Sequence, residues 1–267
     1  MVVLILRHIC ILCLAGGLMV GCRLKQADAS KDPTQLGTDR SIVDPTWPVR
    51  LSLGGTKSTY TDQQSSDISN LNQSLSGVNL TGKRVMAEGY ALLNAATDAA
   101  KSMYGYGAME FRDDGTDRIW WEYQRTYTIK FGLMPMPKIP VMPVIGMYKM
   151  WNGFIGTEPN MPDVTKLDVI ALLLGVDYIH NIWIKPQEIS AFFGGKYHLL
   201  NPGGKNTGSE MEIIVGSKLN FGMLRMDVSF GYLMNSYKGA QPTPDETGML
   251  TIKSDVKTTY GMVSFWL

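Results

Sequence analysis

The feature that most constrains the fold is an alternation of side-chain type that persists over long runs. Residues 122–133 read EYQRTYTIKFGL, with Tyr, Ile, Phe and Leu at odd positions and Glu, Gln, Thr and Lys mostly at even ones. The same alternation recurs in residues 188–199, 210–221 and 224–232. Because successive side chains of a strand point to opposite faces, each run predicts a strand with one apolar and one polar face. The first three runs span 12 residues each, whereas strands of soluble sheets usually have about five or six.

Strands of this length suit a membrane, because a tilted strand that crosses a bilayer needs about 9–11 residues. No backbone group can stay unpaired in lipid, so such strands must close into a barrel. The sequence therefore predicts an all-β fold, an antiparallel up-and-down barrel of about eight strands, since fewer could not close around side chains. The alternative is a soluble lipocalin-like barrel or β-sandwich with the apolar face inside, and the alternation alone does not choose between the two.

The chain ends in YGMVSFWL, residues 260–267. This ending resembles the C-terminal assembly signal of small Gram-negative outer-membrane β-barrels, which usually finish in Phe or Trp; here Leu267 follows Trp266. The resemblance covers roughly residues 105–267 and points to no particular family. It implies insertion into the outer membrane with the help of barrel assembly machinery.

Composition narrows the class of function. The 25 Lys and Arg residues against 24 Asp and Glu give a net charge of +1, so no nucleic-acid partner is expected. Charged residues make up only 18% of the chain, below the usual quarter or so. A low charge content with many glycines and aromatic residues favours a β-rich protein or one that faces lipid.

All three cysteines lie in the first 22 residues, within an apolar leader that follows Arg7. This pattern predicts a secretory signal peptide over residues 1–21. The leader ends in LMVGC, residues 18–22, which resembles the lipobox of bacterial lipoproteins. The resemblance implies cleavage between Gly21 and Cys22, acylation of Cys22 (including palmitate) and handling by lipoprotein assembly machinery. An ordinary signal peptide that happens to contain Cys is the alternative. Arg23 after the cysteine implies anchoring in the cell outer membrane, with outer-membrane lipid as a partner.

Residues 22–47 are polar and lack hydrophobic periodicity, which predicts a flexible tether. Residues 48–267 are assigned to the barrel domain. Within it, residues 56–104 are expected to form a polar loop and helix insertion, because residues 56–80 carry few large apolar side chains. Residues 84–103 are rich in Ala and Leu and predict one short helix; a strand over residues 85–93 is the alternative.

The polar faces of the alternating runs supply the candidate lumen residues. These are Lys196, His198, Glu210, Glu212, Lys218, Arg225 and Asp227. No metal-spaced cluster and no G-x-S-x-G or phosphate-binding loop is present in the sequence. We therefore predict no catalytic residue, no metal and no cofactor.

The function expected from these patterns is that of a lipid-anchored outer-membrane barrel with a structural or small porin-like role. One alternative is an outer-membrane lipoprotein whose soluble β-domain binds a hydrophobic ligand or an envelope partner. Another is a membrane acyl hydrolase that uses His198 with Ser190, which share one parity of the run 188–199. Assembly into a homo-oligomer is left open.

Overall fold

A computed structural model of the chain describes most of the predicted barrel domain. The described residues are 49–66, 73–92, 104–115, 123–134, 141–153, 166–184, 189–204, 206–220, 225–242 and 248–267. The predicted signal peptide, the lipobox with Gly21 and Cys22, and the tether all lie outside these residues. Within the described ranges, no helix is both long and apolar enough to cross a membrane.

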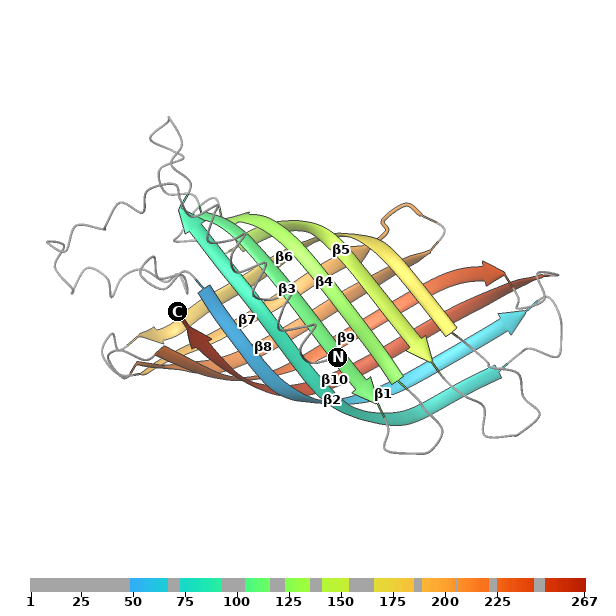
Figure 1. The fold of residues 1–267 in the computed structure, drawn as a ribbon, viewed down its shortest axis with the longest axis horizontal. Coiled ribbons are helices and arrows are strands. Elements are labelled where there is room, and N and C mark those ends of the chain that lie inside the picture. Colours follow the sequence, from blue (N-terminus) through green and yellow to red (C-terminus); the bar gives the residue numbers. More distant parts are fainter. Residues whose placement is uncertain are drawn as a thin grey trace, which may run out of the picture. The chain divides into compact units, whose positions relative to one another are not determined.

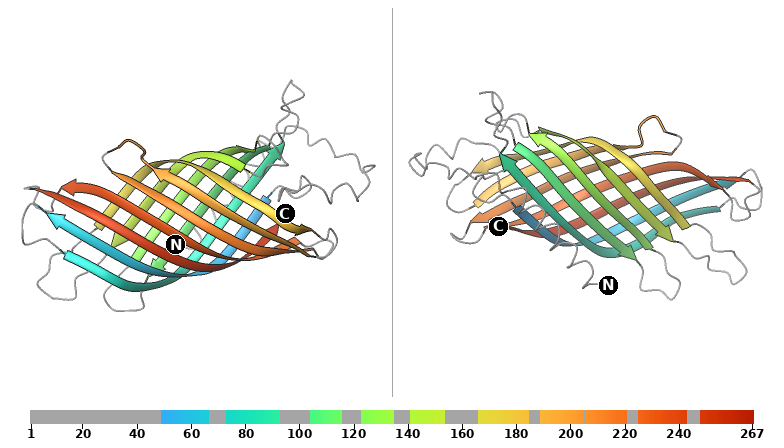
Figure 2. Two further views of the ribbon diagram at one scale, coloured as in Figure 1. Left: turned by 180° about the vertical axis from the view of Figure 1, so that it is seen from behind. Right: turned by 45° about the horizontal axis from the view of Figure 1, so that its top comes forward.

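The described residues form ten antiparallel strands (Figure 1). In chain order they are β1 Val49–Ser66, β2 Gln73–Leu92, β3 Tyr104–Gly115, β4 Tyr123–Met134, β5 Val141–Gly153, β6 Lys166–Ile184, β7 Ile189–Leu200, β8 Thr207–Asn220, β9 Arg225–Pro242 and β10 Met249–Trp266. Each strand pairs with its neighbours in sequence, and β1 pairs with β10 to close the barrel. Figure 2 shows the inclined strands running side by side around the barrel. The predicted all-β, antiparallel up-and-down barrel is confirmed, and the alternative of a β-sandwich is wrong.

The ten strands are close to the predicted number of about eight, and residues 49–92 contribute two long strands that the prediction gave mainly to a loop and a helix. The predicted helix over residues 84–103 is wrong over 84–92, which belong to β2, while residues 93–103 lie outside the described ranges. In β2 the even positions from Arg84 to Tyr90 are buried and the odd positions face outward. Helix propensity of Ala is a weak preference, and here pairing with β1 and β3 overrides it.

The polar stretch 56–80, expected to be a loop, is also largely strand. Residues 56–66 belong to β1 and residues 73–80 to β2. Its inward side chains Thr56 and Ser58 are buried and donate hydrogen bonds to Asp114. Polar residues thus line both faces of these strands, so the sequence lacks the apolar alternation that marks the other strands. A bulge interrupts the β1–β2 pairing at Gly77, whose φ of 74° suits glycine.

The two faces of the barrel wall differ as the parity argument predicts. In β4 the even residues from Gln124 to Lys130 are buried inside, whereas Phe131 and Leu133 are exposed outside. The exposed large apolar side chains of the wall include Leu53, Phe131, Ile145, Met147, Ile170, Tyr197, Ile213, Val215 and Phe230. The barrel wall therefore carries large apolar side chains on its outer surface, while its interior holds charged and polar groups beside buried aromatic and aliphatic ones.

Inward-facing glycines make room for large side chains inside the barrel. A Cβ added at Gly231 would lie 2.1 Å from Cζ of Tyr260, so the buried tyrosine ring occupies the place of a side chain. A Cβ at Gly146 would meet the carbonyl oxygen of Ile129 at 2.1 Å. These glycines allow a narrow ten-stranded interior to hold aromatic and charged groups together.

Candidate functional site

The barrel interior is the candidate functional site, because it gathers buried charge from eight of the ten strands. Buried ionisable side chains are Arg50, Arg84, Glu88, Arg112, Asp114, Lys130, Asp177, Lys196, His198, Glu210, Glu212 and Asp227. Burying a charge costs several kcal/mol unless it is paired, so each of these groups needs a partner. The partners divide into four groups along the lumen.

The first group is centred on Arg84 of β2, and we call it the Arg84 cluster. The Arg84 guanidinium lies 2.8 Å from Oε2 of Glu110 and 2.9 Å from Oε2 of Glu212. It also stacks over the ring of Tyr260, 4.2 Å from its centroid. Nζ of Lys196 lies 3.1 Å from Glu212, and the Tyr260 hydroxyl donates to the same carboxylate. Glu212 thus receives three donor groups from three different strands.

The second group is centred on His198 of β7. Its Nε2 lies 2.6 Å from Oδ1 of Asp177, and its Nδ1 lies 3.0 Å from Oε1 of Glu210. Lys130 donates to the other oxygen of Asp177. An imidazole can donate from both nitrogens only when both are protonated. The geometry therefore suits an imidazolium held between two carboxylates, which is a structural role for His198.

The third group lies where the two ends of the barrel sequence meet. Arg50 on β1 lies 2.8 Å from Glu88 and 3.0 Å from Asp227. The indole Nε1 of Trp266 donates to Asp227 at 2.8 Å. Lys218 Nζ stands over the Trp266 ring, 4.5 Å from its centroid. The penultimate residue of the chain is thereby fixed between cationic groups and an acid.

The fourth group joins the stretch that was expected to be a loop to β3. Arg112 Nε lies 3.3 Å from Oδ2 of Asp114, and the same carboxylate accepts hydrogen bonds from Thr56 and Ser58. Ser58 is in turn 2.8 Å from the hydroxyl of Thr258 on β10. These contacts tie β1, β3 and β10 together inside the barrel.

Tyr106 connects two of the groups. Its hydroxyl donates to Glu88 at 2.9 Å and lies 3.4 Å from Oδ2 of Asp177. The His198 group and the Arg50 group are therefore joined by one buried phenol. Removing a member of one group will disturb its neighbour in the other.

The structure places five of the seven predicted lumen residues in this interior, buried and paired. They are Lys196, His198, Glu210, Glu212 and Asp227. Lys218 is half-buried over Trp266. Arg225 is half-buried beside Trp266 in the strand register, at the start of β9.

Several interior residues were missed by the prediction from sequence. Arg84 and Glu88 were missed because their segment was interpreted as a helix. The signal that could have found them is the alternation of Arg84, Met86 and Glu88 with small outward residues. Asp177 was missed because it lies within an apolar run. A single acid in such a run shows no alternation that would assign its side chain to the interior. In the described part of the chain, no group of three or more metal-type ligands could hold an ion.

The pairing of His198 with Ser190 is wrong. Both residues belong to β7, and eight residues of strand separate their Cα atoms by about 26 Å at 3.3 Å per residue. Both ring nitrogens of His198 already contact carboxylates. A serine nucleophile at position 190 therefore cannot transfer a proton to this histidine.

The outer wall has a polar edge on β2, β3 and β4. Outward charged residues Lys83, Asp113 and Arg125 follow one another across β2, β3 and β4 in register. Arg125 lies 2.8 Å from Asp113, with both side chains about one-third exposed. From this edge to the end of β4 at Met134, the outward positions of the strand are apolar or aromatic.

No protein-family model matches the chain, and no curated protein matches it. Among solved structures, similar chains include the outer membrane protease OmpT of Escherichia coli, at 7% identity and a TM-score of 0.41, covering 82% of this chain and 97% of that one. The toluene transporter TodX of P. putida matches at 7% identity and a TM-score of 0.29, covering 82% and 90%. A loop-deletion variant of the outer membrane protein OmpT of Vibrio cholerae matches at 8% identity and 0.22, covering 81% and 99%. Because these superpositions are loose, the fold assignment rests on the strand pairing itself.

Proposed function

We propose that this chain is a bilayer-spanning β-barrel of the outer membrane whose lumen is closed by side chains and whose role is structural. The observation that carries the proposal is the inverted polarity of the wall. Phe230, Phe131 and Ile170 point outward and are 63%, 62% and 60% exposed, while charged residues such as Arg84 and Asp177 are buried in the interior. A soluble lipocalin-like barrel needs the opposite arrangement, since apolar side chains gain from leaving water.

The height of the apolar surface supports the same proposal. In β6 the outward residues are apolar or aromatic from Ile170 to Tyr178, nine residues of strand. A tilted strand needs about 9–11 residues to cross the hydrocarbon core. Large apolar patches on a water-soluble monomer rarely exceed a few hundred Å², whereas here they follow the outer wall over most of the strands.

The filled interior argues for a structural role over an open pore. Arg84, Asp177 and His198 are each about 1% exposed, so water does not reach their side chains. A barrel of about eight strands has just enough interior for its side chains, and in this ten-stranded barrel large charged and aromatic groups take up the added space. We infer that the barrel does not conduct solutes by free diffusion and does not act as an enzyme through its interior.

We further propose that acylation of Cys22 adds a second attachment to the membrane. The lipobox-like sequence supports this, and at about 0.8 kcal/mol per buried CH₂ three acyl chains would bind firmly. With a barrel that spans the bilayer, the lipid is not needed for retention.

One experiment distinguishes attachment by the spanning barrel from attachment by the acyl chains on Cys22. Membranes from cells that express the Cys22→Ser variant are washed with alkaline carbonate, and the retained fraction is compared with that of the unsubstituted chain. We expect full retention, with heat-dependent migration on SDS gels that reports an intact barrel. Release of the Cys22→Ser variant into the wash would refute membrane spanning. In planar bilayers the purified chain is expected to give no steady conductance, and open-channel currents would refute the closed lumen.

A further inference from the structure

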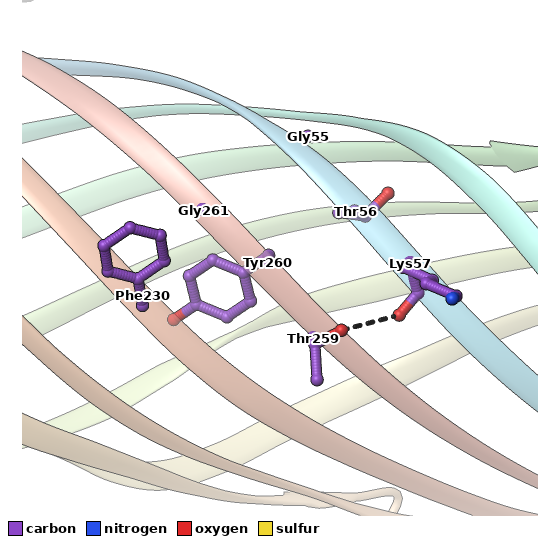
Figure 3. Close-up of a pocket in the computed structure, with 7 residues that line it drawn as sticks. All are labelled: Gly55, Thr56, Lys57, Phe230, Thr259, Tyr260 and Gly261. Carbon is purple, nitrogen blue, oxygen red and sulfur yellow. Dashed lines mark hydrogen bonds between the residues drawn. The ribbon is translucent and has the colours of Figure 1, made fainter.

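A shallow groove crosses the outside of the barrel wall where β1, β10 and β9 lie side by side (Figure 3). Its floor contains Gly55 and Gly261, which are directly paired across β1 and β10 and both point outward. Phe230 of β9, opposite Gly261, forms one side. Lys57 and Thr259 lie at one end, where the Thr259 hydroxyl donates to the Lys57 carbonyl. The groove has a volume of about 390 Å³, within the range of ligand sites.

The groove lies across the edge of the apolar surface. On one side of Gly55, the outward residues Leu53 and Leu51 continue the apolar surface toward Val49, where β1 begins. On the other side, Lys57 and Thr59 are the next outward residues. An occupant of this groove would meet apolar surface at one end and cationic surface at the other.

Lysines gather around the polar end. Lys83 of β2 lies directly opposite Gly55 in the register, and Lys257 of β10 lies opposite Thr59. Neither Lys57 nor Lys83 forms an ion pair with a carboxylate among the residues that the structure describes. The acid next to Lys83, Asp113, already pairs with Arg125.

Farther from the apolar surface, Lys238 and Lys253 are directly opposed across β9 and β10. Like charges in this position destabilise a sheet unless an anion lies between or beside them. Asp255 lies 3.5 Å from Lys253, so a single carboxylate offsets the charge of two neighbouring lysines. The outer face of β1, β2, β9 and β10 thus carries an excess of positive charge on the polar side of the groove, nearest to it at Lys57 and Lys83.

We propose that this groove is a binding site for a membrane lipid with a net anionic phosphate headgroup. One acyl chain lies over Gly55 and Gly261 against the Phe230 ring, and the phosphate is bound by Lys57 and Lys83. The site rests on the proposed function, because it requires this wall to face a bilayer. Glycine at both floor positions keeps the groove open, since any larger side chain there would occupy the path of the chain.

The test measures lipid binding to the full chain in detergent micelles by native mass spectrometry. Phosphatidylglycerol is the anionic probe and phosphatidylcholine the neutral one. We expect one phosphatidylglycerol to bind preferentially. The double variant Lys57→Gln and Lys83→Gln should weaken that binding about tenfold, because charge-assisted hydrogen bonds to phosphate are lost. Equal binding of the two lipids, or unchanged binding by the double variant, would overturn the proposal.

Two further variants test the geometry. Gly55→Leu fills the groove without meeting the backbone, because the nearest heavy atom to an added Cβ is 4.0 Å away; it should weaken phosphatidylglycerol binding while the lysines remain. Lys149→Gln, an outward lysine on β5 beside Trp151, is the matched control and should bind as the unsubstituted chain does. If Gly55→Leu has no effect and inorganic phosphate competes fully, the lysines bind free phosphate and the lipid site is refuted.

A further measurement distinguishes failure of the proposed function from failure of the lipid site alone. All variants are also reconstituted into phosphatidylcholine vesicles and washed with carbonate. A chain that stays in the vesicles but shows no preference for phosphatidylglycerol refutes the lipid site alone. A chain that washes off refutes membrane spanning and the lipid site with it.

Discussion

Replacing Arg84 by Met should destabilise the barrel far more than the loss of a surface ion pair. The substitution keeps much of the side-chain length but removes the guanidinium that joins Glu110 to Glu212. Glu212 keeps two of its donors, from Lys196 and Tyr260. Glu110 loses the arginine, and its side chain is only 12% exposed.

The magnitude follows from these contacts. Breaking a buried ion pair by removing one partner costs about 3–5 kcal/mol, because the remaining charge stays out of water. Since one of the two acids keeps other donors, we expect the lower end, about 3 kcal/mol. At 298 K that is a change of more than about a hundredfold in the folding equilibrium constant.

The exposed pair of Arg125 and Asp113 provides a matched control. Its 2.8 Å separation equals that of Arg84 and Glu110, but its side chains are 39% and 34% exposed. Arg125→Met should cost only about 0–1 kcal/mol. The measurement is urea unfolding of the reconstituted chain followed by tryptophan fluorescence, with both variants compared at the same lipid-to-protein ratio.

A second substitution checks the cause. Adding Glu110→Gln to Arg84→Met removes the charge left without its partner, so it should restore part of the lost stability. Equal costs for Arg84→Met and Arg125→Met would refute the reasoning, because burial would then make no difference. Failure of Glu110→Gln to restore any stability would assign the loss to packing against Tyr260 instead.

Four other outcomes follow from the structure. Phe131→Arg should cost about 2–4 kcal/mol in a bilayer although the side chain is exposed; no loss in the urea midpoint would argue for a water-facing wall. His198→Gln should cost about 1–3 kcal/mol, because an amide has a single donor group for two carboxylates; unchanged stability would contradict the imidazolium assignment. Gly231→Ala should displace the Tyr260 ring and lower the temperature at which heat-dependent gel migration changes, whereas Gly89→Ala, where an added Cβ meets nothing within 4 Å, should not. Lys57→Gln alone should leave the urea midpoint unchanged, and a large shift would mean that its role is structural.

The alternation predicted the barrel and the polarity of its two faces, because it indicates on which face of a strand each side chain lies. It succeeded for His198, Glu210 and Glu212, where outward neighbours are large and apolar. It failed for Arg84 and Glu88 in β2, because Ala and Gly occupy all three outward positions from Ala87 to Ala91 and carry little hydrophobic signal. The predicted number of about eight strands is close to ten, and it fell short because residues 56–80, polar on both faces, were interpreted as a loop.

The pairing of interior charges could not have been predicted from local patterns. Arg84 and Glu212 are separated by 128 residues in the sequence. They are in contact because the barrel closes and because the strand register places both residues at the same level along the barrel axis. The groove at Gly55 and Gly261 depends on the β1–β10 register as well. Such contacts become visible only once the strand order and the register are known.

Closure between the first and last strands also sets the order of events in biogenesis. The backbone of Val49 exchanges two hydrogen bonds with Leu267, and Ser52 meets Ser264 inside the barrel, 212 residues away in sequence. These contacts form only when β10 reaches β1, so a partly assembled barrel carries two open strand edges until then. Contacts so distant in sequence are slow to form. A chain that loses only its last strand would keep nine strands and still present unpaired edges on β1 and β9, and aggregation or proteolysis would compete with its assembly.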